Sequence, residues 1–107
     1  MIIAGVDQKG EAIYVIDPSG TYVQFTAVAI GAGADDVNSF LEKNYNPDMS
    51  LEEAAALAIA SINLKDEAKD EIKNVKMAKV SSESKVFEKV SDSDLENYSK
   101  NVSKFTN

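Results

Sequence analysis

The first thirty residues show the hydrophobic pattern that is typical of β-strands. Residues 2–7 (IIAGVD) are an apolar run and residues 12–17 (AIYVID) are β-branched and aromatic, so each predicts a strand. Residues 21–30 (TYVQFTAVAI) predict a third strand, which alternates at first and is apolar on both faces over residues 27–30. Such a doubly apolar stretch is expected to have cover on both sides of its sheet.

Glycine and proline mark the connections between these segments. Gly10 lies in the polar segment 8–11, which predicts a turn between the first two strands. Residues 17–20 (DPSG) have the residue order that a type I turn prefers. Residues 31–33 (GAG) end the third predicted strand and precede a helix.

A helical period replaces the strand pattern after residue 33. The first predicted helix carries apolar side chains at helical spacing and ends in residues 44–48 (NYNPD); these side chains are Val37, Phe40, Leu41 and Tyr45. Ser50 and Glu53 then form a capping-box pattern at the start of an alanine-rich helix over residues 51–62. On this second helix one apolar stripe is expected, made of Leu51, Ala55, Ile59 and Ile62.

The last third of the chain predicts a hairpin and a final helix. Residues 65–74 are highly charged and fit either a solvated helical extension or a loop. Residues 75–80 and 85–90 predict two short strands joined by a turn over residues 81–84. Ser91 and Asp94 indicate a helix start, and the apolar side chains that follow are Leu95, Tyr98, Val102 and Phe105. The resulting order βββ-αα-ββ-α predicts an α+β fold with an antiparallel sheet.

Composition excludes several classes of function. The chain has 107 residues, no cysteine, no histidine and a net charge of -7, and all eleven of its basic residues are lysines. The missing histidine removes the usual general base at neutral pH, and the missing cysteine removes thiol metal ligands. The negative charge and the missing arginine argue against nucleic acid and anionic membranes as partners.

Two candidate sites near the middle of the chain are explained by turn chemistry. A dinucleotide fingerprint needs a third glycine where this chain has Asp36, and Asp35 adds a second carboxylate where phosphate would bind. Thr21 could act as an N-terminal nucleophile only if the chain were cut after Gly20, which would discard two strands. We therefore interpret both sites as architecture.

The remaining candidates are acidic pairs and aromatic side chains. The acidic pairs lie at predicted helix starts, where capping and the helix dipole account for them: Asp35 and Asp36, Glu52 and Glu53, Asp92 and Asp94. The aromatic residues expected in the core are Tyr14, Tyr22, Phe25 and Phe40. The residues alone assign no catalytic, cofactor-binding or metal-ligating position.

Several motifs occur together in an order and spacing that resembles one protein family. They are Gly5-Val6-Asp7, the Asp17–Gly20 turn, the Ala27–Gly33 junction, the Leu41–Tyr45 helix end and the Asp48–Ala54 helix start. Residues 2–62 are thereby similar to the C-terminal half of α subunits of the archaeal-type 20S proteasome, and residues 75–105 are similar more loosely.

This resemblance implies a fold and a role. The fold is the C-terminal half of an Ntn-hydrolase-like αββα sandwich, with residues 1–107 as a single partial domain. The role is that of a non-catalytic structural subunit of the outer α ring, whose partner β subunits degrade unfolded proteins. The resemblance implies other α and β subunits as partners, no cofactor, no peptidase activity in this chain and a cytoplasmic location.

The related β subunits offer a direct comparison within the same family. They carry a catalytic N-terminal threonine and, beyond their second helix, an Arg-Asp motif with a supporting serine. The region after Ile62 has no arginine here, and the Asp17–Gly20 turn also favours the α type.

The partial coverage predicts that the chain is a truncated, split or degraded form of a subunit. An apolar strand at its start and a doubly apolar stretch at residues 27–30 also predict self-association. Two alternatives stay open: a stand-alone, self-associating binding module without peptidase activity, and a threonine hydrolase that uses Thr21.

Overall fold

The computed structural model describes residues 1–65 and 71–105. The elements in these residues are β1 (Ile2–Asp7), β2 (Gly10–Ile16), β3 (Tyr22–Phe25), α1 (Ala34–Asn44), α2 (Leu51–Ile62), β4 (Ala78–Val80), β5 (Phe87–Lys89), α3 (Asp92–Ser99) and the 3-10 helix η1 (Val102–Lys104). This order confirms the predicted βββ-αα-ββ-α sequence and the mixed α and β content. The strands pair antiparallel, but they form two separate sheets instead of one.

The N-terminal sheet is an antiparallel meander in the order β1-β2-β3. Its register places Ala4 opposite Ile13 and Ile13 opposite Phe25. Because strand side chains alternate, this register gathers on one face Ile2, Ala4, Val6, Glu11, Ile13, Val15, Val23 and Phe25. One face of the sheet is therefore apolar except for Glu11.

The third strand is shorter than predicted, since β3 ends at Phe25 and not at residue 30. The side-chain amide of Asn38 explains the difference. Its Oδ1 accepts the Ala29 N–H at 2.8 Å and its Nδ2 donates to the Ala29 carbonyl at 3.1 Å. The backbone of Ala29 is thus satisfied by α1, so residues 27–30 are not in the sheet and the expected two-sided cover was wrong.

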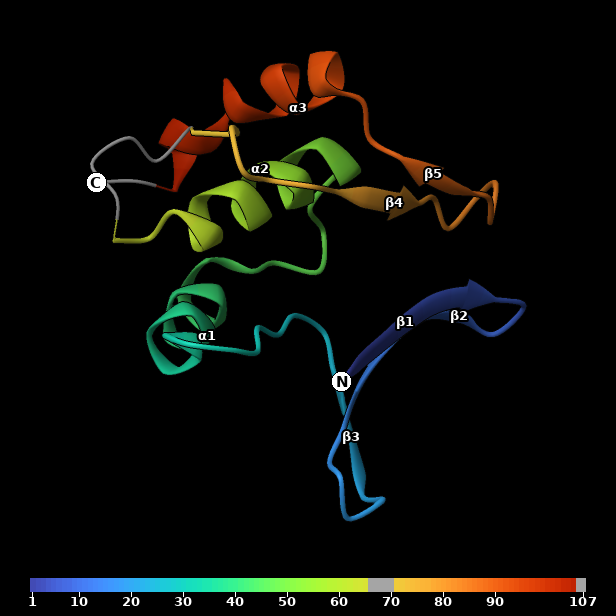
Figure 1. The fold of residues 1–107 in the computed structure, drawn as a ribbon. Helices are drawn as coiled ribbons and strands as arrows, with labels where there is room; N and C mark the ends of the chain where they lie inside the picture. Colours follow the sequence, from blue (N-terminus) through green and yellow to red (C-terminus); the bar gives the residue numbers. More distant parts are fainter. Residues whose placement is uncertain (66–70, 106–107) are drawn as a thin grey trace.

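The helices form a second part of the molecule, in which α2 lies between α1 and α3 (Figure 1). Their core contains Ile59, Leu95 and Val102, whose side chains are almost completely buried. The predicted stripe on α2 is only partly right. Ala55 and Ile59 are buried, whereas Leu51 and Ile62, at the two ends of the helix, are 41% and 61% exposed.

The β4–β5 hairpin confirms the predicted strand pair in a shortened form. The Lys85 N–H donates to the Ser81 carbonyl at 2.8 Å, and Lys85 has the positive φ of 58° that closes the turn. Figure 1 shows the hairpin running alongside α2 and α3, while β1–β3 extend away from the helices.

The predicted final helix is interrupted. α3 ends at Ser99, and the chain continues through i to i+3 hydrogen bonds, such as Asn101 N–H to the Tyr98 carbonyl, into η1. These tighter turns still bury Val102 on the same side as Leu95. In the charged segment, residues 66–70 lie outside the described residues, and residues 71–74 are not helical.

The aromatic side chains do not all reach the core. Phe40 packs against the helical core and Tyr14 is half-buried, but Tyr22 and Phe25 are 69% and 39% exposed. Tyr22 and Tyr14 instead contact each other edge to face, with ring centroids 5.7 Å apart. The prediction of four core aromatics was therefore wrong for the residues on β3, because none of the helices in the described part of the chain covers that strand (Figure 1).

Candidate functional site

An open cavity of about 410 Å³ lies between the N-terminal sheet and the β4–β5 hairpin. Its apolar lining includes Val6, Ile13 and Phe25 from the sheet, and Val80 and Phe87 from the hairpin. We call this cavity the inter-sheet groove. The surrounding charges are sparse, since the charged residues that line it are Glu11 and Lys79.

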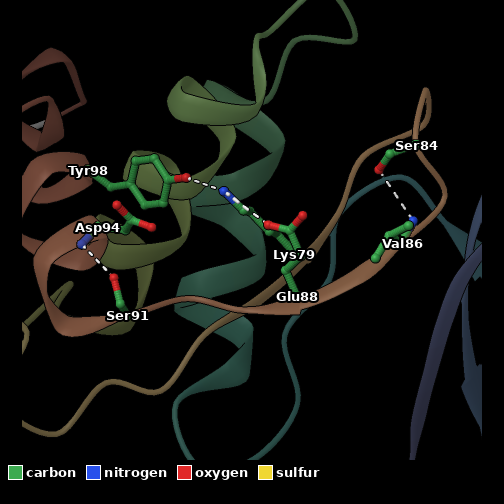
Figure 2. A network of polar contacts seen from close by, with 7 residues as sticks. All are labelled: Lys79, Ser84, Val86, Glu88, Ser91, Asp94 and Tyr98. Carbon is green, nitrogen blue, oxygen red and sulfur yellow. Dashed lines mark hydrogen bonds and ion pairs between the residues drawn. The ribbon is translucent and has the colours of Figure 1, made fainter.

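A polar network holds the hairpin on the helices beside this groove (Figure 2). The Lys79 Nζ on β4 donates a hydrogen bond to the Tyr98 hydroxyl on α3 at 3.1 Å. The same Nζ lies 5.8 Å from the centre of the Tyr98 ring and 3.8 Å from the Glu88 Oε2 on β5. Lys79 therefore connects both strands of the hairpin with α3.

This network does not produce a reactive amine. The hydrogen bond to Tyr98 raises the pKa of Lys79 above its usual value of 10.5, with smaller favourable contributions from the carboxylates of Glu88 and Asp94. A raised pKa keeps the ammonium protonated at neutral pH, whereas a catalytic lysine needs a lowered one. The arrangement serves to position the hairpin.

Thr21 closes the turn that precedes β3. Its carbonyl accepts the Asp17 N–H at 2.9 Å, and its hydroxyl lies 3.3 Å from that of Ser19. The Gly20 N–H in turn donates to the Asp17 carbonyl at 2.9 Å, as the predicted turn requires. Thr21 is thus part of a turn. Its nitrogen belongs to the peptide bond with Gly20 and is not the free amine that an N-terminal nucleophile needs.

The glycine pair forms a strand-to-helix junction. Gly33 is the N-cap of α1 and has a φ of 77°, which glycine adopts without steric cost. Asp35 and Asp36 occupy the first turn, and Asp36 lies 3.0 Å from the exposed Lys65 Nζ. Two acidic residues therefore lie in the first turn of the helix, where their charge opposes the binding of a phosphate.

The other acidic pairs also lie in first turns of helices, as predicted. The backbone and side-chain hydrogen bonds from Ser50 lower the pKa of Glu53, which completes the capping box of α2. The Ser91 hydroxyl accepts the Asp94 N–H at 3.2 Å and caps α3. In residues 1–65 and 71–105, no three acidic side chains are placed to hold a metal ion together.

Sequence reasoning missed both Asn38 and the contact between Lys79 and Tyr98. Tyr98 was expected on an apolar face, and the signal available was that a buried tyrosine hydroxyl usually finds a polar partner. Asn38 lies inside a helix, where asparagine is not favoured. This unfavourable position was the only feature of the sequence that indicated a special role for Asn38.

Residues 1–80 match the family described as Proteasome subunit. The chain is 39% identical over 104 residues to the proteasome subunit alpha of Pyrococcus horikoshii, a match that covers 97% of this chain and 39% of that protein. It is 39% identical over 95 residues to the proteasome subunit alpha of Pyrobaculum aerophilum, covering 89% of this chain and 39% of the relative. It is 34% identical over 98 residues to proteasome subunit alpha type-2-A of Arabidopsis thaliana, covering 92% and 41%.

These matches cover most of the chain, and each of the three relatives is named an alpha subunit. The chain spans about two fifths of the length of these relatives. The family match over residues 1–80, together with at least 34% identity to these relatives, shows that the chain belongs to the proteasome subunit family.

Proposed function

We propose that this chain is a non-catalytic structural subunit of the outer α ring of a 20S proteasome. In that role it contributes to ring assembly and to restricted entry of unfolded proteins, which β subunits degrade. The match to alpha subunits over most of the chain is the observation that carries this proposal.

The proposal also covers the fold, the partners and the location of this chain. Residues 1–107 form a single partial domain, equivalent to the C-terminal half of an Ntn-hydrolase-like αββα sandwich. The antiparallel pairing in both sheets and the helices α2 and α3 beside the hairpin support this arrangement. Its partners are other α subunits and β subunits, and its location is the cytoplasm. Within the described residues, no helix is long and apolar enough to cross a membrane.

The chain itself is proposed to have no peptidase activity. Thr21 is engaged in a turn, and the amine of Lys79 is held in its charged form. A Thr21→Ala variant is therefore expected to leave any peptidase activity of a reconstituted particle unchanged. Activity that disappears with this substitution would show that the threonine-hydrolase interpretation is the correct one.

Reconstitution with an archaeal β subunit tests the ring assignment. The chain is mixed with purified β subunits, with and without an N-terminal segment of an alpha subunit, and the particles are analysed by native mass spectrometry. Incorporation of the chain into a ring-shaped particle is expected. A stable homodimer that does not bind β subunits in either mixture would instead support the stand-alone binding module.

A further inference from the structure

Two turns of this chain begin with an aspartate or asparagine that is followed by proline. They are residues 17–20 (DPSG) and residues 46–49 (NPDM), and residues 17–20 and 46–48 are exposed to solvent. Pro18 and Pro47 are the two prolines of the sequence, so Asp17–Pro18 is its single Asp-Pro bond. The two turns therefore differ in the side chain before proline, which is a carboxyl in one and an amide in the other.

The first turn holds the carboxyl group of Asp17 close to its own peptide bond. Asp17 Oδ1 accepts the Ser19 N–H at 2.9 Å. The ring that this hydrogen bond closes contains the Asp17 carbonyl carbon and Pro18, so the carboxyl is kept near the bond between them. The Asp17 carbonyl oxygen in turn accepts the Gly20 N–H at 2.9 Å. This donor favours the negative charge that develops on a carbonyl oxygen when a nucleophile attacks the carbon.

The bond to proline is well suited to such an attack. Its nitrogen belongs to a tertiary amide and carries no hydrogen. Such a nitrogen is protonated more readily than that of an ordinary peptide bond, which makes it the better leaving group. A carboxylate is an effective nucleophile in covalent catalysis, and one on the same residue has the rate advantage of proximity.

We propose that the Asp17–Pro18 bond is a self-cleavage site, at which the Asp17 carboxyl group cuts its own backbone in mildly acidic solution. A side-chain oxygen forms a bond to the Asp17 carbonyl carbon, and the carbon–nitrogen bond to Pro18 breaks. The proline nitrogen takes a proton from the solvent and leaves as an amine. Water then opens the cyclic anhydride on Asp17, which restores its side-chain carboxyl and leaves a carboxyl at the new C-terminus.

The position of this bond in the sheet permits the cut. The last pair of the β2–β3 ladder is Ile16 with Tyr22, and the bond lies beyond it in the exposed turn. Water therefore reaches the bond, and none of the hydrogen bonds of the ladder has to break. Cleavage needs only this chain and water, so it does not depend on entry into a ring.

The second turn is a control within the same molecule. Asn46 Oδ1 accepts the Asp48 N–H at 2.9 Å, and the Asn46 carbonyl oxygen accepts the Met49 N–H at 3.0 Å. This is the arrangement of the first turn, with an amide where Asp17 has a carboxyl. An amide is the poorer nucleophile, so the Asn46–Pro47 bond is expected to stay intact.

Mass spectrometry of the intact protein tests the proposal. The purified chain is kept in a mildly acidic buffer in which circular dichroism confirms that it is folded, and samples are taken over time. Two fragments that meet between residues 17 and 18 are expected, with masses that sum to the mass of the chain plus one water. No cleavage at this bond, or faster cleavage between residues 46 and 47, would overturn the proposal.

Two conservative variants identify the attacking group. Asp17→Asn keeps the oxygen that accepts the Ser19 N–H and is expected to abolish cleavage after residue 17. Asn46→Asp keeps the corresponding acceptor of the second turn and is expected to create a second cleavage site after residue 46. Cleavage that persists in Asp17→Asn would refute the role of the carboxyl. An intact Asp-Pro bond in Asn46→Asp would also contradict the proposal, because the same turn would then fail to direct the same reaction.

The contribution of the folded turn is measured on the unaltered chain. In the same buffer with a denaturing concentration of urea, the hydrogen bonds from Ser19 and Gly20 are lost. Cleavage after residue 17 is expected to slow by about tenfold or more, since the carboxyl is no longer held beside the carbonyl carbon. An equal or faster rate in urea would refute the inference that the turn prepares this bond for attack.

Discussion

Removing the buried side chain of Ile59 tests where the core of this molecule lies. Ile59 has no exposed surface and packs among Ala56, Leu95 and Val102. Ile59→Ala removes three carbon atoms, which at about 0.8 kcal/mol per buried methylene gives about 2.4 kcal/mol for transfer alone. The cavity left behind adds to this value, so we expect a loss of about 3 to 4 kcal/mol in the free energy of unfolding.

Ile62 provides the matched control, since it is the same residue type on the same helix and is 61% exposed. Ile62→Ala should change stability by less than about 0.5 kcal/mol, because it removes little buried surface and alanine favours the helix slightly. The assay is urea unfolding followed by circular dichroism at 222 nm. If Ile59→Ala leaves too little folded protein, Ile59→Val should cost about 0.5 to 1.5 kcal/mol.

Equal losses for the two alanine variants would refute the reasoning. They would show that Ile62 is as buried in solution as Ile59, and that the single apolar stripe expected from the sequence describes α2 better than the structure does.

Three further predictions concern polar contacts. Ser50→Ala should cost about 1 kcal/mol by urea unfolding. The difference from the unaltered chain should shrink in acid, because the lowered pKa of Glu53 gives a contribution that is complete above pH 4.5 and is lost as the pH falls through the folded value. A difference that grows in acid would contradict the capping box. Tyr98→Phe should lower the pKa of Lys79 in a carbon-13 NMR titration, since the hydroxyl that favours the ammonium is gone. In the unaltered chain this raised pKa adds stability that is complete below pH 10.5 and is lost as the pH rises through the folded value, and an unchanged pKa in the variant would refute the contact. Asn38→Ala should cost about 1 to 2 kcal/mol by urea unfolding, whereas Asn38→Asp, which keeps only the acceptor, should show whether the donor contributes. No loss for either variant would mean that water replaces both hydrogen bonds.

Local patterns predicted the parts of the fold that depend on nearby residues. The capping box of Ser50 and Glu53 was found because its partners lie three residues apart. The Asp17–Gly20 turn was found because its residue order fixes its geometry. The end of β3 was missed because it is set by Asn38, nine residues beyond Ala29 and on a different element.

The apolar positions predicted a core but not what covers it. The alternation at the start of residues 21–30 cannot tell whether an apolar face meets a helix, a second sheet or a partner. Phe25 was therefore expected in the core and lies on the uncovered sheet. The exposure of Phe25, like that of Phe87, is determined by tertiary packing and cannot be predicted from neighbouring residues in the sequence.

The two hydrogen bonds of Asn38 bear on the order in which the chain unfolds. They attach residue 29 to α1, so the boundary between the sheet and the helices is held from the helical side. The pairing of β1–β3 can therefore open while α1–α3 keep their packing, since Ile59, Leu95 and Val102 all lie on the helical side. Unfolding is then expected in two stages, with amides of the sheet exchanging through a smaller opening free energy than those of α2.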